Sequence, residues 1–227
     1  MAGTLSRGVT KTDKPALARY LVDIGVPVRP LAPGRKLPIK SEQGSVYTLT
    51  NPDTAAAWWE AYPRDNIGLC HAPIGGSRIV CVDVDVSEAP QEQHSAIVDH
   101  LRVLGVRRQA RAWLQRTGRG NYQFLFAWRK AFPPPVKVTN AGGLHIDLLS
   151  NGYSVIAPSD TSQEPSKHPG QRGGGPYTWA YGHEPGEWWP DYTDVELGEL
   201  KVGQPTPTSG KWRYCKRCNT QERVRVR

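Results

Sequence analysis

The sequence lacks any apolar run that approaches the roughly 20 residues needed to cross a bilayer, and the N-terminal stretch MAGTLSRGVTKTDK lacks the apolar centre of a secretory signal. We therefore expect a cytoplasmic protein with no membrane partner. Cysteine is also scarce: four in 227 residues are too few for a disulfide framework, and Cys81 lies in an apolar run that favours a reduced, packed thiol. The chain has no GxxxxGK[ST] phosphate loop either, so a helicase-type motor is not expected within it.

Acidic residues are scarce only at the C-terminal end of the chain. The net charge is +8, and residues 211–227 hold seven Lys or Arg against one Glu, which leaves a net +2 for the first 210 residues. A basic tail of this kind predicts contact with phosphate groups without sequence readout, although a solvated, disordered end explains the charge equally well.

The remainder is organised as one domain. Residues 1–12 are polar and expected to be disordered, residues 13–200 form the domain, residues 201–210 are a linker, and residues 211–227 are the basic tail. Strand and helix patterns alternate within the domain, which predicts an α/β or α+β fold. We expect helices at 13–24, 51–62 and within 91–105, strands at 66–71, 79–86, 110–115, 121–128, 144–150, 153–157 and 177–182, a short extended piece within 26–39, and a lid-like loop at 159–176.

Two aspartates interrupt the most apolar strand, IVCVDVDV. Side chains alternate across a strand, so Asp83 and Asp85 share a face with Ile79 and Cys81, and that face changes from apolar to acidic partway along. Two neighbouring carboxylates repel each other, so the pair requires a cation. Oxygen ligands favour magnesium or manganese, although acidic residues that merely mark the end of a strand are an alternative.

A third acid interrupts another apolar strand, LHIDLLS, at Asp147. The Asn151-Gly152 pair that follows it is a strong hairpin signal, so residues 144–150 and 153–157 are expected to be antiparallel neighbours. If Asp147 converges on Asp83 and Asp85, the three carboxylates can hold two divalent ions, the arrangement used in phosphoryl and nucleotidyl transfer. The glycine turn of TGRGNYQFLF, with its exposed amides and Arg119, is a candidate cradle for a triphosphate or an ordinary hairpin turn.

The order of several motifs resembles a known family. GVPVRPLAPGRKLPI, AYPRDNIGL, VDVDV, TGRGNYQFLF, IDLLSNGYSVIAPS and PYTWAYG occur along residues 15–192 as they do in the bifunctional primase/polymerase domain of the archaeo-eukaryotic primase superfamily, found in phage and plasmid replication proteins. The resemblance implies an archaeo-eukaryotic primase fold, with a catalytic sheet like an RNA-recognition motif packed beside an N-terminal α/β unit. It also implies synthesis from ribo- or deoxyribonucleoside triphosphates on a single-stranded DNA template, alongside a separate replicative helicase.

The resemblance assigns roles to individual residues. Asp83, Asp85 and Asp147 correspond to the residues that bind two catalytic Mg²⁺ or Mn²⁺ ions in the family. Arg119, with Lys36 or Arg35, would stabilise the triphosphate, although a solvated loop charge explains Lys36 better.

The sequence departs from the family at one important position. The family's middle motif ends in a histidine that contacts the nucleotide, whereas Gln123 stands there, and a glutamine donates a hydrogen bond but carries no charge. His145, two residues before Asp147, is a candidate to take over that contact, or is a histidine satisfied by backbone or water. The family's Pro-Ser-x-His-Pro stretch matches either Ser159 directly or Ser166 and His168 after an insertion.

The tail holds one CxxC pair, Cys215 and Cys218. No second pair follows, so the residues form half of a Zn²⁺ site or a pair of unliganded thiols. Aromatic and basic side chains surround the pair and suit single-stranded nucleic acid. These candidates are Lys211, Trp212, Arg213, Tyr214, Lys216 and Arg217.

Three functions remain open at this point. A primase/polymerase explains the ordered motifs, the three aspartates and the basic tail. A nucleotide-sugar glycosyltransferase explains the DxD pair but neither Asp147 nor the tail. A catalytically weakened, binding-only relative of the primases is indicated by Gln123.

Overall fold

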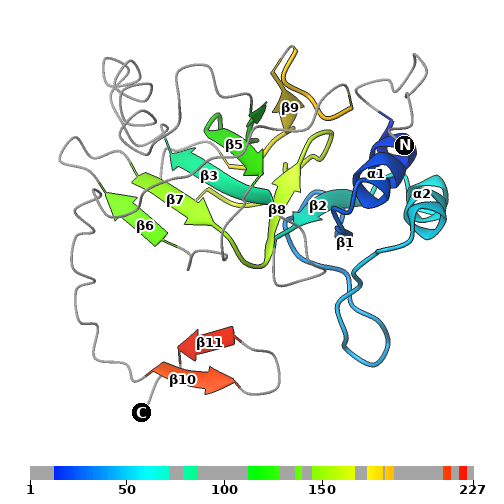
Figure 1. Cartoon of the computed structure of the whole chain (residues 1–227), viewed down its shortest axis with the longest axis horizontal. Coiled ribbons are helices and arrows are strands. Elements are labelled where there is room, and N and C mark those ends of the chain that lie inside the picture. Colours follow the sequence, from blue (N-terminus) through cyan, green and yellow to red (C-terminus); the bar gives the residue numbers. More distant parts are fainter. Residues whose placement is uncertain are drawn as a thin grey trace.

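The structure, a computed structural model, describes residues 13–71, 79–85, 112–127, 136–139, 145–166, 173–180, 182–186, 212–215 and 220–223. For 136–139, 145–146, 212–215 and 220–223 it describes the backbone. Within these described residues, two helices, two antiparallel sheets and a C-terminal hairpin give an α+β fold (Figure 1). None of the described helices has the length and apolar character of a membrane span.

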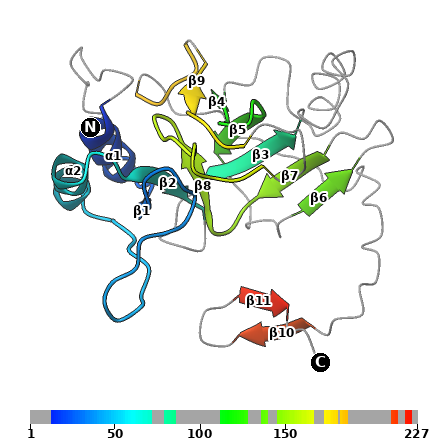
Figure 2. The ribbon, with the colours of Figure 1, turned by 180° about the vertical axis from the view of Figure 1, so that it is seen from behind.

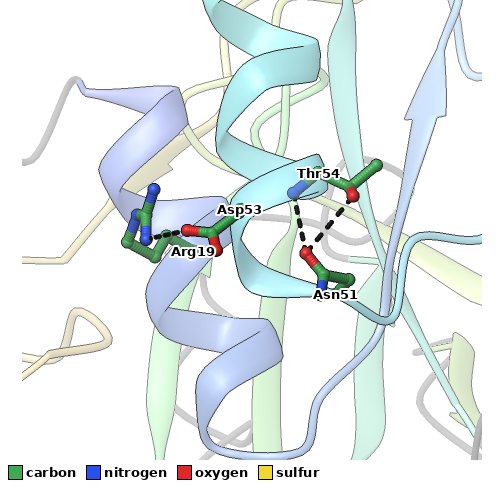
Figure 3. Close-up of polar contacts among 4 residues, drawn as sticks. All are labelled: Arg19, Asn51, Asp53 and Thr54. Carbon is green, nitrogen blue, oxygen red and sulfur yellow. Dashed lines mark hydrogen bonds and ion pairs between the residues drawn. The ribbon is translucent and has the colours of Figure 1, made fainter.

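Both N-terminal helices form where their capping residues predict. Helix α1, Lys14–Asp23, begins after Asp13, whose carboxylate accepts a hydrogen bond from Ala16 N at 3.3 Å. Helix α2, Pro52–Ala61, begins after Asn51, whose Oδ1 accepts from Thr54 N at 3.0 Å (Figure 3). Each has a proline in its first turn, where the missing N–H costs nothing. The predicted helices at 13–24 and 51–62 are therefore confirmed.

The two helices lie side by side and cover one end of the molecule (Figures 1 and 2). Arg19 and Asp53 form an ion pair between them at 2.5 Å, with both side chains largely exposed (Figure 3). The buried contact is apolar and includes Leu21 and Trp59, both fully buried. This burial, and not the exposed ion pair, holds the helices together.

The smaller sheet has three antiparallel strands. Strand β2, Asn66–Cys70, lies between β1, Val28–Leu31, and β8, Tyr153–Ile156. All five residues of β2 are buried, as expected for a central strand with packing on both faces. This sheet lies between the helices and the larger sheet (Figures 1 and 2).

The larger sheet contains six strands in the order β6-β7-β3-β5-β4-β9. Strand β3, Ile79–Asp85, is central and pairs antiparallel with β5 on one side and β7 on the other. The remaining bounds are Trp113–Arg116 for β4, Tyr122–Ala127 for β5, Val136–Thr139 for β6, His145–Leu149 for β7 and Thr178–Trp179 for β9.

One apolar core joins the helices to both sheets. It includes Leu17 of α1, Ile67 of β2, Cys81 of β3 and Trp113 of β4. Cys70 and Cys81 are buried free thiols, which confirms the packed, reduced thiol expected for Cys81. Burial raises the pKa of Cys70 to about 11 and that of Cys81 well above its ordinary value.

The hairpin predicted from Asn151-Gly152 is wrong. Gly152 does turn the chain, with φ of 72°, but the strands on its two sides lie in different sheets. Strand β7 pairs with β3 and β6, whereas β8 pairs with β2, from Ile67 opposite Ile156 to Cys70 opposite Tyr153. The edge of β7 that a hairpin would use is occupied by β6, a strand the sequence did not predict because three prolines precede it.

The arms of the predicted lid-like loop are tied to each other and to the body. Thr161 N donates to Gly175 O at 2.9 Å, and Tyr177 N donates to Ser159 O at 2.7 Å. Gln163 N donates to Gly34 O at 3.0 Å. The described arms of this loop are thus packed, and residues 167–172 lie outside the described part.

The C-terminal tail contains a β-hairpin of β10, Trp212–Cys215, and β11, Thr220–Arg223, with Cys215 opposite Thr220. The expected last strand of the domain is confirmed as the short β9. The predicted disordered segment 1–12, the helix within 91–105 and the linker 201–210 lie outside the described residues.

Candidate active site

A row of polar side chains crosses the larger sheet. Asp83 of β3 lies opposite Asp147 of β7 on one side and opposite Gln123 of β5 on the other, and Gln123 lies opposite Gln115 of β4. Residues directly opposite each other in antiparallel strands project from the same face with Cβ atoms about 5 Å apart. The two sequence-distant aspartates are therefore immediate neighbours.

The change from apolar to polar occurs across the whole sheet, not in β3 alone. The neighbouring row on the same face lies two residues away along each strand and is apolar. It consists of Leu149, Cys81, Leu125 and Trp113, all of which belong to or pack against the core. One step forward, the backbone of His145 lies opposite Asp85. The sheet thus packs one end of this face into the core and presents carboxylates at the other end.

Asp83 is the most electrostatically perturbed carboxylate of the row. Burial, the charge of Asp85 and, more weakly, the charge of Asp147 raise its pKa to about 7, while a hydrogen bond from Gln123 and the charge of Lys36 act in the opposite direction. Its Oδ1 is buried and has no hydrogen-bond partner among the described residues. Burying a carboxylate oxygen that has no hydrogen-bond partner costs free energy unless a cation binds to it.

The glycine turn between β4 and β5 closes over the acidic end. Asn121 Nδ2 donates a short hydrogen bond to Asp85 Oδ1, and Asn121 N donates to Thr117 Oγ1 at 3.1 Å. Gly118 lies so close to the backbone of Gly175 that a Cβ there would overlap it. Glycine is required at this position because the turn and the 173–175 segment approach backbone to backbone.

Arg119 projects from this turn. One of its terminal nitrogens, Nη2, donates to Pro165 O at 2.8 Å, which ties the turn to the loop after β8. Its Nε is buried and has no partner among the described residues. A buried guanidinium nitrogen without an acceptor is a candidate anion-binding group.

Lys36 comes to the site from the N-terminal unit, on a loop held at several points. Lys36 N donates to Glu164 Oε1 at 2.9 Å, and Tyr153 Oη donates to Lys36 O at 2.8 Å. Its Nζ stands 6.0 Å from the ring centroid of Tyr177, a buried tyrosine whose pKa is raised by burial and then by Asp83. The positive charge of Lys36 acts on Asp83 as well and lowers the pKa of its carboxyl, which makes Lys36 a candidate cation for the acidic end of the sheet.

Other predicted nucleotide contacts are placed differently. The Ser159 side chain is 1% exposed and bonded to the backbone of β2, accepting from Ile67 N at 2.9 Å. Ser166 and Arg35 are exposed, and His145 is placed by its backbone only, opposite Asp85. His168, Lys211, Lys216, Arg217 and Cys218 lie outside the described residues, and Trp212, Arg213, Tyr214 and Cys215 are placed by the backbone of β10.

Sequence reasoning missed three residues of this region: Gln115, Asn121 and Tyr177. Gln115 is fully buried, and the signal for it was present, because it interrupts the inward-facing row after Trp113 as Asp83 does after Cys81. Asn121 follows the glycine turn directly. The place of Tyr177 beside Asp83 depends on the path of the loop after β8, which no local pattern reveals.

The carboxylates do not enclose a metal ion by themselves. Across the described ranges, no three Asp, Glu, His or Cys side chains lie close enough together to do so. What the row offers is Asp83 and Asp147 in direct opposition, Asp85 one step along the same face, and one buried carboxylate oxygen without a described partner. This donor set fits magnesium or manganese, which commonly take one or two protein carboxylates and fill the remaining positions with water and phosphate oxygens.

Comparison with known proteins identifies a family for the chain. No curated protein matches the chain at a significant level. A family described as bifunctional DNA primase/polymerase, N-terminal, matches residues 17–192. This range contains both sheets of the domain, most of α1, all of α2 and the row of polar residues. The match covers more than half of the chain. The chain therefore belongs to the bifunctional DNA primase/polymerase family, whose members are nucleotidyltransferases of the primase/polymerase type.

Proposed function

We propose that this protein is a DNA primase/polymerase that synthesises primers or extends DNA from nucleoside triphosphates on a single-stranded DNA template. The observation that carries the proposal is the pairing of Asp83 with Asp147 across adjacent strands, with Asp85 on the same face. A family match alone would leave the chemistry unassigned, whereas this row gives it acidic groups of the required kind.

Asp83, Asp85 and Asp147 would hold two divalent ions, Mg²⁺ or Mn²⁺, with no more than two of the carboxylates on either ion and with water and phosphate oxygens in the remaining positions. When bound, such ions neutralise phosphate charge and lower the pKa of the attacking hydroxyl group. The unpartnered Oδ1 of Asp83 supports this role, because a buried oxygen is left for a cation.

The chain's own cations would bind the triphosphate. Arg119 offers the buried Nε from the glycine turn, and Lys36 reaches the same end of the sheet from the N-terminal unit. Both loops are braced by the loop after β8, through Pro165 O for Arg119 and Glu164 Oε1 for Lys36 N. Bracing of this kind orients donors before the substrate arrives, which favours the transition state.

The template would lie on basic and aromatic surface. The tail hairpin β10–β11 carries Trp212, Arg213 and Tyr214 on one strand, a combination that suits stacking and phosphate contact with single-stranded DNA. In this proposal a separate helicase unwinds the DNA, and the protein acts in phage or plasmid replication in the cytoplasm of a bacterial host. Zn²⁺ at Cys215 and Cys218 would rigidify the hairpin.

The test is a primer-extension and priming assay on single-stranded DNA with Mg²⁺ or Mn²⁺, comparing the wild type with Asp83→Asn and Asp85→Asn. Asp53→Asn is the matched control, because Asp53 is exposed and pairs with Arg19 on the helices (Figure 3). We expect template-dependent synthesis that both site variants abolish and the control retains. Equal synthesis by all four proteins, or synthesis without a template, would refute the assignment.

Gln123 favours one second candidate, a binding-only relative of the family. A neutral amide stands where the family has a nucleotide-contacting histidine, and its carbonyl oxygen already accepts a hydrogen bond from Gln115 at 2.6 Å. Such a protein would bind template and triphosphate yet release no pyrophosphate. Pyrophosphate release in the same assay therefore separates the two candidates.

A further inference from the structure

Two buried glutamines connect the backbone of the smaller sheet to Asp83. Gln115 is fully buried and Gln123 is 5% exposed, and neither is a residue that the proposed chemistry requires. Two buried amides side by side are costly unless every polar group is satisfied, so their hydrogen bonds indicate why they are there.

Backbone groups at the end of β8 fix the orientation of Gln115. Ala157 N donates to Gln115 Oε1 at 2.8 Å, and Gln115 Nε2 donates to Val155 O at 2.8 Å. An amide N–H only donates and a carbonyl oxygen only accepts, so the two ends of the Gln115 side chain cannot be exchanged.

The orientation of Gln115 in turn fixes that of Gln123. Gln115 Nε2 donates to Gln123 Oε1 at 2.6 Å, so Gln123 must use its carbonyl oxygen there. Only its NH₂ group remains for its other neighbour, and that neighbour is Asp83, with which Gln123 is in direct register. Hydrogen bonding from the Gln123 side chain lowers the pKa of the Asp83 carboxyl, as expected for an NH₂ group that faces it across the two strands.

We propose that Gln115 and Gln123 form a one-way relay, the amide relay, that holds the Asp83 carboxylate in position to bind a divalent cation. Gln123 is then a positioning residue and not a contact for the nucleotide. The inference rests on the proposed function, because it takes Asp83 as a metal ligand. It explains how one oxygen of Asp83 accepts a protein hydrogen bond while Oδ1 stays buried and without a partner among the described residues.

The relay also joins the two sheets. Val155 belongs to β8, which pairs with β2, and Ala157 follows β8 directly. Gln115, Gln123 and Asp83 belong to the larger sheet. The backbone of the neighbouring sheet therefore helps to fix the position of the Asp83 carboxylate, in addition to its own strand.

Two substitutions separate the relay from a structural role. Gln123→Met removes the donor with little change in volume. Gln115→Glu keeps the acceptor for Ala157 N but loses the donor, so Gln123 must turn its NH₂ toward residue 115 and its carbonyl oxygen toward Asp83. An added negative charge alone would raise affinity for a cation, so a loss of affinity is the result expected from the reversed amide. Because Gln115→Glu also turns a carboxylate oxygen toward Val155 O, binding is compared at a temperature at which the variant is folded.

The experiment measures Mn²⁺ binding to the full chain without nucleotide, from the electron paramagnetic resonance signal of free Mn²⁺. We expect Kd to rise about 10- to 100-fold in Gln123→Met and at least several-fold in Gln115→Glu. In the double variant, Gln115→Glu should add no further loss, because it acts only through Gln123. Trp58→Phe, which loses a hydrogen bond to Asp65 far from the relay, is the control and should bind Mn²⁺ as the wild type does.

Three results would overturn the relay. They are an unchanged Kd in Gln123→Met, tighter binding in Gln115→Glu, and wild-type binding no tighter than that of Asp83→Asn. A structural role alone would lower the unfolding temperature of both variants while leaving Kd unchanged. Because this measurement needs no catalysis, the relay can hold when template-dependent synthesis is absent, and it can fail when synthesis is present.

Discussion

At the scale of single residues, Asp83 is the clearest case in which the proposed function lowers the stability of the fold. Its carboxylate is held close to Asp85 and Asp147 and partly away from water, and its pKa is raised to about 7. Such a group destabilises the metal-free protein at the pH at which a cation would use it. The site therefore favours cation binding at the expense of the stability of the empty fold.

The raised pKa of Asp83 predicts how stability depends on pH. The unfolded chain ionises near the ordinary value of 3.8, so the stabilising contribution of the protonated group is complete below that pH and is lost as pH rises toward 7. At pH 8 without metal, Asp83→Asn should raise the free energy of unfolding by on the order of 4 kcal/mol. At pH 4 it should change little. Urea denaturation at both pH values measures this.

The effect of Mn²⁺ on the unfolding temperature tests the same description of Asp83 in the presence of a cation. Mn²⁺ should raise the unfolding temperature of the wild type but not of Asp83→Asn, since a ligand stabilises only the state that binds it. A variant that is no more stable at pH 8, or that Mn²⁺ stabilises like the wild type, would contradict the electrostatic description of Asp83.

His71 is the second buried titratable group with a predictable effect. Its Nδ1 lies 2.9 Å from Ile79 O and its Nε2 lies 2.8 Å from Ser154 Oγ, and burial lowers its pKa to about 4. The neutral ring contributes stability that is complete above the ordinary value of 6.5 and is lost as pH falls toward 4.

The shift of His71 corresponds to about 3 kcal/mol across this range. In His71→Gln that pH-dependent loss should be absent, although the variant is less stable at neutral pH. Equilibrium unfolding between pH 4 and 7 measures the slope. The same slope in both proteins would assign the loss to other groups.

At the scale of elements, the turn between β4 and β5 is the feature that brings Arg119 and Asn121 to the site. Gly118→Ala should push the turn away from Gly175, because the new Cβ meets backbone and not a flexible side chain. We expect weaker triphosphate binding, by about tenfold, measured by calorimetry with a nucleotide and metal. Gly44→Ala is the control: a Cβ at Gly44 meets nothing within 4 Å, so this variant strains the backbone at a φ of 80° without displacing another segment. If both variants bind the triphosphate equally well, the turn does not position Arg119.

The elements also show what sequence patterns can and cannot predict. Both described helices were predictable because their signals are local: Asp13 and Asn51 as caps, prolines in the first turn, and an apolar face. Asp83 and Asp147 were predictable as site residues because each interrupts an apolar strand. That the two lie side by side could be stated from the sequence only as a hypothesis.

Strand pairing was not predictable in the same way. Asn151-Gly152 specifies a turn, but the partner of each strand was decided by which sheet edge was free, and that is a tertiary property. For the same reason the sequence could place Gln123 in a strand but could not show that Gln115 would bond to its carbonyl oxygen.

At the scale of the whole molecule, charge separates the domain from the tail. Residues 211–227 hold seven basic side chains and one acidic one, whereas the first 210 residues are nearly balanced. Removing residues 211–227 should weaken binding to single-stranded DNA. It should also flatten the dependence of log K on log salt, by about 0.7 for each phosphate that the tail neutralises in the intact protein. Fluorescence anisotropy at several salt concentrations measures both quantities. An unchanged slope would place the DNA-binding surface within residues 1–210.

The whole account depends on the two aspartates that face each other across β3 and β7. The most direct measurement is an anomalous difference map from crystals grown with Mn²⁺, a single-stranded template and a nucleotide whose α-phosphate cannot be transferred. The account predicts a Mn²⁺ peak bound by the carboxylates of Asp83 and Asp147, with the triphosphate beside Arg119 and Lys36. A bound nucleotide with no metal at this pair, or with its metal held by other residues, would contradict it.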